Sequence, residues 1–240
     1  MQSGQTARYL RSEGKMPRQM KKWILFLLAV LVFLFASCSD KVNGQETDDP
    51  GKNIERTDET VRYDCDVVFF GDSITCDGNF DELFPEYRIV NLGVYGDTIE
   101  DLIRRVPDVR AENPKQIFLL VGINSLTPNN GEACLIQYAE LLDALRAACP
   151  EAELIVQSVL PVGTELDWDG GLNKAVRSFN EGLKALAGER DCPFVDLYAL
   201  YEQDGALNPT LTRDGVHLNF NAYGPWTASI ERLIETSRKK

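Results

Sequence analysis

Two hydrophobic patterns alternate along the chain beyond residue 62. Five short runs are apolar almost throughout, which is typical of strands buried on both faces of a sheet. They are residues 65–70, 88–92, 117–121, 154–160 and 194–197, of which 88–92 has the weakest pattern. Three other segments carry apolar residues at every third or fourth position, which indicates amphipathic helices: residues 135–145, 176–186 and 223–233.

This alternation predicts an α/β fold with a parallel sheet between two helical layers, that is, a three-layer α/β/α sandwich. Pro225 is compatible with the last helix because it falls in the first turn. Polar, glycine-containing turns follow the first three strands in residues 71–73, 93–98 and 122–124. Ligand sites of parallel sheets lie at the carboxyl ends of the strands. We therefore expect these turns to meet at one edge of the sheet.

The N-terminal part of the chain differs from the rest. Lys21 and Lys22 precede an uncharged, apolar stretch over residues 23–37, which is short for a membrane span and typical of a signal peptide. The stretch ends in Ala36, Ser37 and Cys38, which resembles the lipobox of bacterial lipoproteins. It implies a lipid anchor at Cys38 and a periplasmic or cell-surface location. A signal peptide cut without lipidation, or an uncleaved anchor, are the alternatives.

The predicted organisation has three parts. Residues 1–37 are an N-terminal extension and signal peptide, and 63–240 form one domain. Residues 38–62 between them are polar and are predicted to be a flexible tether.

The whole chain has a net charge of −12, and the part beyond residue 37 carries 19 basic and 36 acidic residues. This acidic body would repel phosphate, so we predict no nucleic-acid partner.

Besides Cys38 the chain has five cysteines, an odd number that cannot pair completely. The sequence allows one disulfide between Cys149 and Cys192 but does not require it. Cys65 and Cys134 are predicted to be small buried thiols. No Cys-x-x-Cys occurs and there is a single histidine, so we predict no metal site.

His217 is that histidine, and any chemistry that needs an imidazole near neutral pH must use it. Ser73 follows the first strand directly and is a candidate nucleophile, which needs a nearby base because a hydroxyl reacts poorly at neutral pH. An unperturbed imidazole pKa of about 6.5 suits that base. Asp214 precedes the histidine by one turn and can orient it.

A serine nucleophile also needs donors for the oxyanion of the tetrahedral intermediate. The backbone N–H groups of Ser73 and Gly96 and the side-chain amide of Asn124 are the candidates, all at the expected edge of the sheet. We interpret Asp97 as a helix cap and not as a catalytic residue. Trp168 either lines a sugar or acyl site or anchors its loop.

Together these residues resemble a known family. Gly71-Asp72-Ser73-Ile74-Thr75, Gly96-Asp97-Thr98, Gly122-x-Asn124 and Asp214-x-x-His217 match, in order, the four sequence blocks of the SGNH (GDSL) hydrolases. The resemblance runs from about residue 64 to 234. It implies a flavodoxin-like, five-stranded parallel sheet, Ser73 as nucleophile, His217 as base and Asp214 as its partner. Ser125 stands where the third block often has aspartate, which implies altered local support.

The implied activity is that of a serine esterase without cofactor or metal. Removal of short acyl groups, acetyl above all, from glycans is the preferred reading, because it fits an anchored, acidic protein outside the cytoplasm. A lysophospholipase or other lipid acylhydrolase is the runner-up. A non-catalytic carbohydrate-binding protein of the same fold is the competing class. The oligomeric state and the alcohol of the ester stay open.

Overall fold

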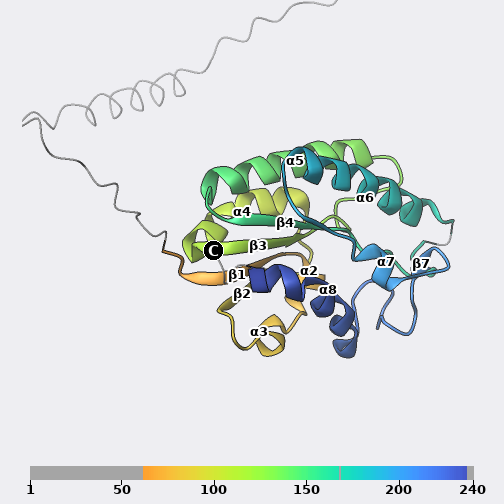
Figure 1. Ribbon diagram of the computed structural model, residues 1–240. Helices are drawn as coiled ribbons and strands as arrows, with labels where there is room; N and C mark the ends of the chain where they lie inside the picture. The colour runs from red at the N-terminus through yellow and green to blue at the C-terminus, as the bar shows by residue number, and fades with distance from the viewer. Residues whose placement is uncertain (1–61, 168, 237–240) are drawn as a thin grey trace, which may run out of the picture. The chain divides into compact units, whose positions relative to one another are not determined.

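A computed structural model describes residues 62–167 and 169–236 of the chain. Cys38, Trp168, the predicted signal peptide and nearly all of the predicted tether therefore lie outside the described residues. Five strands form one parallel sheet in the order β2-β1-β3-β4-β5, with helices on both faces (Figure 1). The predicted α/β/α sandwich with a five-stranded parallel sheet is confirmed.

The strands are β1 (Cys65–Gly71), β2 (Ile89–Gly93), β3 (Pro114–Leu120), β4 (Glu153–Gln157) and β5 (Phe194–Val195). The carboxyl end of β1 is aligned with those of its two neighbours, because Gly71 lies opposite both Gly93 and Leu120. Three chain segments thus leave the sheet side by side at one edge. A small antiparallel hairpin, β6 (Glu202–Gln203) and β7 (Ala206–Leu207), lies outside the sheet.

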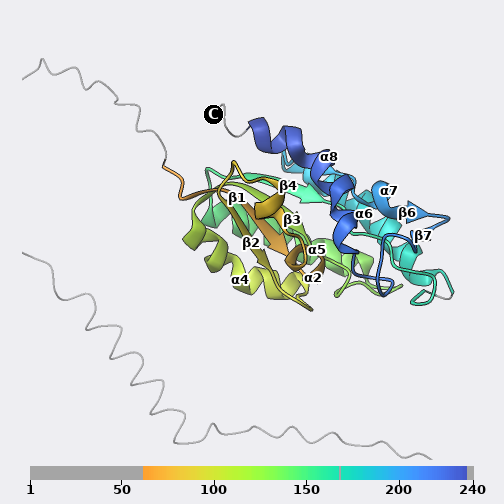
Figure 2. The same cartoon turned by 90° about the horizontal axis from the view of Figure 1, so that it is seen from below.

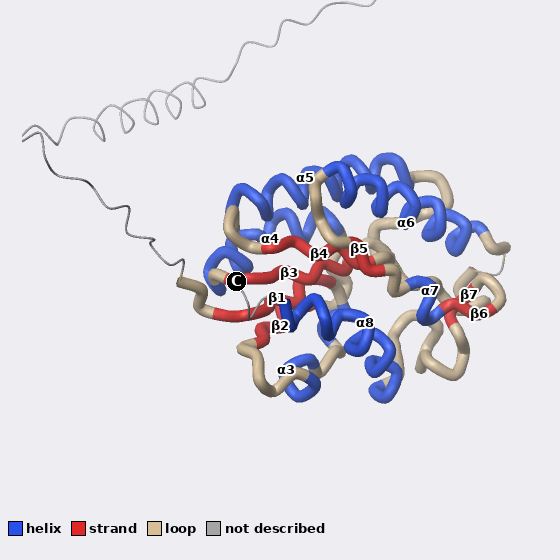
Figure 3. The backbone as a smooth tube through the Cα atoms, in the orientation of Figure 1, coloured by secondary structure: helices blue, strands red, loops and turns tan. Residues whose placement is uncertain are grey.

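One helical layer contains α4 (Ile99–Glu112), α5 (Gly131–Ala148) and α6 (Gly171–Glu189). The opposite face carries the short helices α2 (Ser73–Cys76), α3 (Phe80–Leu83) and α7 (Tyr198–Tyr201), the 3-10 turn η1 (Phe220–Ala222) and the long α8 (Tyr223–Thr236). Figure 3 shows the strands between these two sets, and Figure 2 looks onto the layers from below. The predicted last helix is confirmed, with Pro225 in its first turn.

The two-residue period of a strand divides the core between the two faces. Val68 and Phe70 of β1 pack with the α4–α6 layer, while Val67 and Phe69 pack with the other helices. Trp226 of α8 is fully buried, and its indole N–H donates to Gln157 at the end of β4 at 2.7 Å. Both faces of the sheet are therefore covered by apolar side chains, as the continuous apolar runs predict.

Two strands are shorter than predicted: β4 ends at Gln157 instead of residue 160, and β5 ends at Val195 instead of residue 197. The apolar run after β4 is buried, but side chains of α6 replace its strand partners. Asn180 accepts from the N–H of Val159 at 2.9 Å and donates to its carbonyl at 2.8 Å. Asn173 makes the same pair of bonds with Val162, both at 2.9 Å.

Among the described residues no helix is both long and apolar enough to span a membrane.

Candidate active site

The candidate residues lie at the carboxyl edge of the sheet, on the segments just beyond the strand ends. Ser73 follows β1, Gly96 follows β2 and Asn124 follows β3, and these three strand ends are aligned. Asp214 and His217 come from the loop that precedes α8. The fold thus brings together residues that are up to 144 positions apart in the sequence.

Ser73 begins the short helix α2 directly after β1. The side chain of Asp72 caps this helix by accepting the N–H of Ile74 at 3.0 Å. Gly71 at the end of β1 has no room for a side chain, because a Cβ there would collide with the carbonyl oxygen of Leu120 on β3. Ser73 is only 4% exposed. Its backbone N–H belongs to the first turn, whose donors have no acceptor within the helix.

His217 connects Ser73 to Asp214. The imidazole Nε2 lies 2.8 Å from Ser73 Oγ, and Nδ1 lies 2.7 Å from Asp214 Oδ2. The other carboxylate oxygen, Oδ1, accepts the backbone N–H groups of Val216 at 3.0 Å and His217 at 2.8 Å. With Asp214 ionised, Nδ1 carries the ring proton and Nε2 is free to accept the hydroxyl proton of Ser73.

The hydrogen bonds around Asp214 keep it ionised. Its partial burial would raise the pKa, but the N–H of His217, the imidazole and the N–H of Val216 outweigh this and lower the pKa of Asp214 to about 2. The carboxylate is therefore negative throughout the pH range in which an imidazole titrates. A negative charge at this position stabilises a protonated His217 ring.

Gly96 has a left-handed backbone conformation, with φ +81°. A Cβ at this position would meet no atom within 4 Å, so the backbone angle and not the lack of space requires glycine. The residue lies on the turn between β2 and α4, on the same edge of the sheet as Ser73.

Asn124 and Ser125 support this turn from the loop after β3. The Asn124 amide donates to the carbonyl of Asp97 at 3.0 Å, and its second N–H hydrogen points elsewhere. The Ser125 hydroxyl accepts the N–H of Ile99 at 2.9 Å and so serves as an acceptor for the first turn of α4. Serine at this position therefore has a structural partner of its own.

The prediction that Asp97 caps a helix is wrong. Thr98 is the N-cap of α4, and it forms a capping box with Asp101. Asp97 instead forms an ion pair with Arg105, whose guanidinium also donates to the carbonyl of Leu92 at 2.9 Å. The ion pair fixes the loop after β2 against α4 because Arg105 lies further along that helix.

Three side chains beside His217 are not among the sequence-based candidates. Asp77 accepts the Tyr95 hydroxyl on one carboxylate oxygen and Arg213 on the other, the latter at 2.6 Å. The Tyr95 ring centroid lies 5.9 Å from that of His217. Tyr95 and Arg213 each come directly before one of the sequence blocks, but spacing gives no signal for the contact because Asp77 and Arg213 are 136 positions apart.

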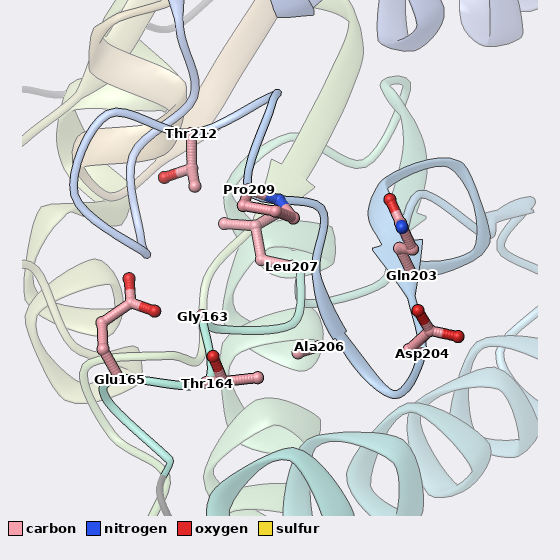
Figure 4. A pocket seen from close by; sticks show the side chains of 9 residues that line it. All are labelled: Gly163, Thr164, Glu165, Gln203, Asp204, Ala206, Leu207, Pro209 and Thr212. Carbon is pink, nitrogen blue, oxygen red and sulfur yellow. The ribbon is translucent and has the colours of Figure 1, made fainter.

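A pocket of about 210 Å³ lies next to the Asp214–His217 loop (Figure 4). It lies between the Thr164–Glu165 segment and the β6–β7 hairpin, and Thr212 closes it from the side of the histidine loop. Leu207 and Pro209 line it with apolar surface. Glu165, Gln203 and Asp204 add carboxylate and amide groups.

The five cysteines of the described region are free thiols, so Cys149 and Cys192 do not pair in this structure. Cys65 and Cys134 are buried as predicted, and burial raises the pKa of Cys65 to about 12, assisted by the negative charge of Glu112. Within residues 62–167 and 169–236 no group of three or more His, Cys, Asp or Glu could hold a metal ion.

The chain is similar in sequence to a known protein family and to curated proteins. The sequence profile of the GDSL-like Lipase/Acylhydrolase family matches residues 69–224. Platelet-activating factor acetylhydrolase IB subunit alpha1 of Rattus norvegicus is 27% identical over 180 residues, which cover 70% of this chain and 75% of that protein.

Two solved structures share the fold. A GDSL-like lipase from Bacteroides thetaiotaomicron superposes with a TM-score of 0.62 at 24% identity, covering 72% of this chain and 89% of that chain. An acetyl xylan esterase superposes with a TM-score of 0.58 at 24% identity, covering 68% of this chain and 98% of that chain.

Proposed function

Since this chain belongs to the GDSL-like lipase/acylhydrolase family and is a carboxylic ester hydrolase, we propose that it removes short acyl groups, acetyl above all, from carbohydrates. Ser73 is the proposed nucleophile, His217 its base and Asp214 the residue that orients the histidine. The observation that carries this proposal is the hydrogen-bonded series Ser73–His217–Asp214, with distances of 2.8 and 2.7 Å.

In the first half of the reaction Ser73 Oγ attacks the ester carbonyl carbon and its proton passes to His217 Nε2. The tetrahedral intermediate then collapses. The carbon–oxygen bond to the alcohol breaks, and the alcohol oxygen takes the proton from His217. The acyl group remains on Ser73 as an ester. Asp214 stabilises the protonated imidazole throughout this step, because its low pKa keeps it negative.

In the second half, water attacks the acyl carbon while His217 Nε2 takes a proton from the water. The bond between Ser73 Oγ and the acyl carbon then breaks, Oγ takes the proton back from His217, and the carboxylic acid is released. The oxyanion of each intermediate would accept the N–H groups of Ser73 and Gly96 and the Asn124 amide hydrogen that does not point at Asp97. Such donors are effective because their positions are fixed before the reaction.

Two features favour an acetyl ester of a sugar. Two of the proteins similar to this chain are named an acetylhydrolase and an acetyl xylan esterase. The pocket beside the histidine loop offers Glu165, Gln203 and Asp204, whose oxygen and amide groups suit sugar hydroxyls. We propose that this pocket receives part of the alcohol.

The proposal is tested by hydrolysis of 4-nitrophenyl acetate. We expect the wild-type protein to be active at pH 7.5 and Ser73→Ala to lose at least roughly 10³-fold in kcat/KM. Ser178→Ala is the matched control, since it removes a hydroxyl from an exposed serine on α6. Inactive wild type between pH 6 and 9, or a Ser73→Ala variant as fast as wild type, would contradict the esterase assignment. Acetylated xylan oligosaccharides and lysophospholipids, compared next, separate the carbohydrate from the lipid alternative.

We also propose that the protein is an exported lipoprotein anchored through Cys38. The support is the sequence alone: two lysines, an apolar stretch over residues 23–37, and small residues before the cysteine. More than one acyl chain on that cysteine would be needed for stable attachment, because a single chain binds membranes only marginally.

A further inference from the structure

Asp77 lies where three segments of the proposed site meet. Its backbone N–H donates to the carbonyl of Ser73 at 3.0 Å, so it is tied to the nucleophile's own helix. One carboxylate oxygen accepts the Tyr95 hydroxyl from the loop after β2. The other accepts Arg213 from the histidine loop at 2.6 Å. With 16% of its side chain exposed, Asp77 is largely shielded from water, which strengthens both contacts.

Arg213 has two carboxylates within reach. Its Nη2 lies 2.6 Å from Asp77 Oδ2, while its Nε lies 3.8 Å from Asp214 Oδ2. That second oxygen is the one that binds His217 Nδ1, at 2.7 Å. A guanidinium that moved fully onto Asp214 would compete with His217 for the same oxygen and would neutralise its charge.

We infer that Asp77 is a positioning residue that holds Arg213 away from Asp214 and so reserves that carboxylate for His217. The catalytic consequence of this inference rests on the proposed function. The effect of Asp77 on the charge state of His217 does not depend on it. Tyr95 assists by occupying the second oxygen of Asp77, so that the carboxylate keeps one orientation. Arg213 thus lies closer to the carboxylate of Asp77 than to that of Asp214.

The effect is measurable because the chain has a single histidine, whose ring protons give one unambiguous NMR signal. Several charged or titratable groups face this ring or its loop, from every segment packed around it. They are Asp214 and Arg213 on the loop itself, Asp77 after α2, Tyr95 after β2 and Glu165 beside Gly215. Only the first three take part in the proposed competition.

The test is a double-substitution cycle followed by NMR titration of His217 in protein purified without a histidine tag. We expect Asp77→Asn to lower the titration midpoint by about 0.5–1 pH unit, because Arg213 then neutralises Asp214. Arg213→Gln in the wild-type background should move it by less than about 0.3 unit. Arg213→Gln in the Asp77→Asn background should restore the wild-type midpoint.

Equal shifts from Arg213→Gln in both backgrounds would overturn the inference, because they would show that the charges act independently. An unchanged midpoint in Asp77→Asn would overturn it as well. Asp143→Asn is the matched control: it breaks the 3.0 Å pair with Arg190 late in α5, towards the opposite edge of the sheet, and should not move the midpoint. If Asp77→Asn does not fold, Asp77→Ser takes its place in the same cycle.

Activity gives a second, separate readout. In Asp77→Asn we expect kcat for 4-nitrophenyl acetate to fall by about tenfold or more with little change in KM, as for an interaction that acts in the transition state. A wild-type protein without esterase activity but with the expected NMR cycle would refute the proposed function and leave the role of Asp77 in place. An active wild type in which none of the substitutions moves the His217 midpoint would support the proposed function and refute the role of Asp77.

Discussion

Asp72, directly before the proposed nucleophile, places a carboxyl group in the interior of the protein. Asp72 is fully buried, and within the described part of the chain its Oδ2 has no hydrogen-bond partner. Burial, with a further contribution from the negative charge of Asp97, outweighs the hydrogen bond from Ile74 and raises the pKa of Asp72 from 3.8 to about 7. Ionised Asp72 therefore destabilises the folded state.

The sign of this effect sets a pH dependence. Because the folded-state pKa lies above the unfolded one, Asp72 is neutral in both states well below pH 3.8 and contributes no penalty there. As the pH rises from there towards about 7, the unfolded chain ionises first and the free energy of unfolding falls. Above that range the loss is complete and constant.

Asp72→Asn should remove this pH dependence. Asparagine keeps an oxygen for the N–H of Ile74 and carries no charge. We expect the variant to gain on the order of 2–3 kcal/mol relative to wild type between pH 4.5 and pH 8, measured as the difference in free energy of unfolding in urea. A difference between the two proteins that is the same at both pH values would show that Asp72 is not destabilised by ionisation.

At this scale the sequence was informative about residues that share a block and uninformative about contacts between blocks. Ser73, Gly96, Asn124 and the Asp214–His217 pair could be named because each block has its own spacing. Asp97 forms an ion pair with Arg105 and does not form the expected helix cap. No local sequence pattern indicates this ion pair. The contacts of Asp77 depend in the same way on the final fold.

At the scale of elements, α6 does more than cover the sheet. Two buried asparagines on it, Asn173 and Asn180, bind both backbone groups of Val162 and Val159, respectively. They complete the hydrogen bonds of an apolar segment that has left the sheet. This explains why the apolar run extends beyond β4: the segment is buried like a strand but is paired with side chains.

Asn180→Ala should therefore be costly. It would leave the N–H and carbonyl of Val159 without these partners in a buried place, and we expect a loss of about 2–4 kcal/mol in the free energy of unfolding. Lys184→Ala on the exposed side of the same helix is the control and should change the value by less than about 0.5 kcal/mol. Similar values for the two variants would contradict the stabilising role of the bonds between Asn180 and Val159, since alanine itself favours a helix.

At the scale of the whole molecule, the layers and the parallel sheet could be predicted from hydrophobic period alone, since runs buried on both faces need helices on both sides. The edge at which the site forms followed from the same argument. The length of β4 could not be predicted, because a buried apolar run looks the same whether its backbone partners are a strand or the Asn180 side chain.

The proposed anchor also belongs to this scale, because it concerns where the entire protein resides. Cys38→Ala should release the protein from the membrane fraction of cells that express it, since the lipidated residue would be missing. Western blotting of membrane and soluble fractions is the measurement, with Cys76→Ala as the matched cysteine substitution in the folded domain. Unchanged fractionation of Cys38→Ala would indicate another mode of attachment.

The loop that carries Asp214 and His217 is closed on itself. Thr212 and Leu218 form a bridge at its base, and the Thr212 hydroxyl donates to the His217 carbonyl at 2.7 Å and accepts from Gly215 at 2.9 Å. These bonds hold base and acid together within the loop itself. The spacing between Asp214 and His217 is thereby set by the loop's own backbone and does not depend on the contact with Ser73.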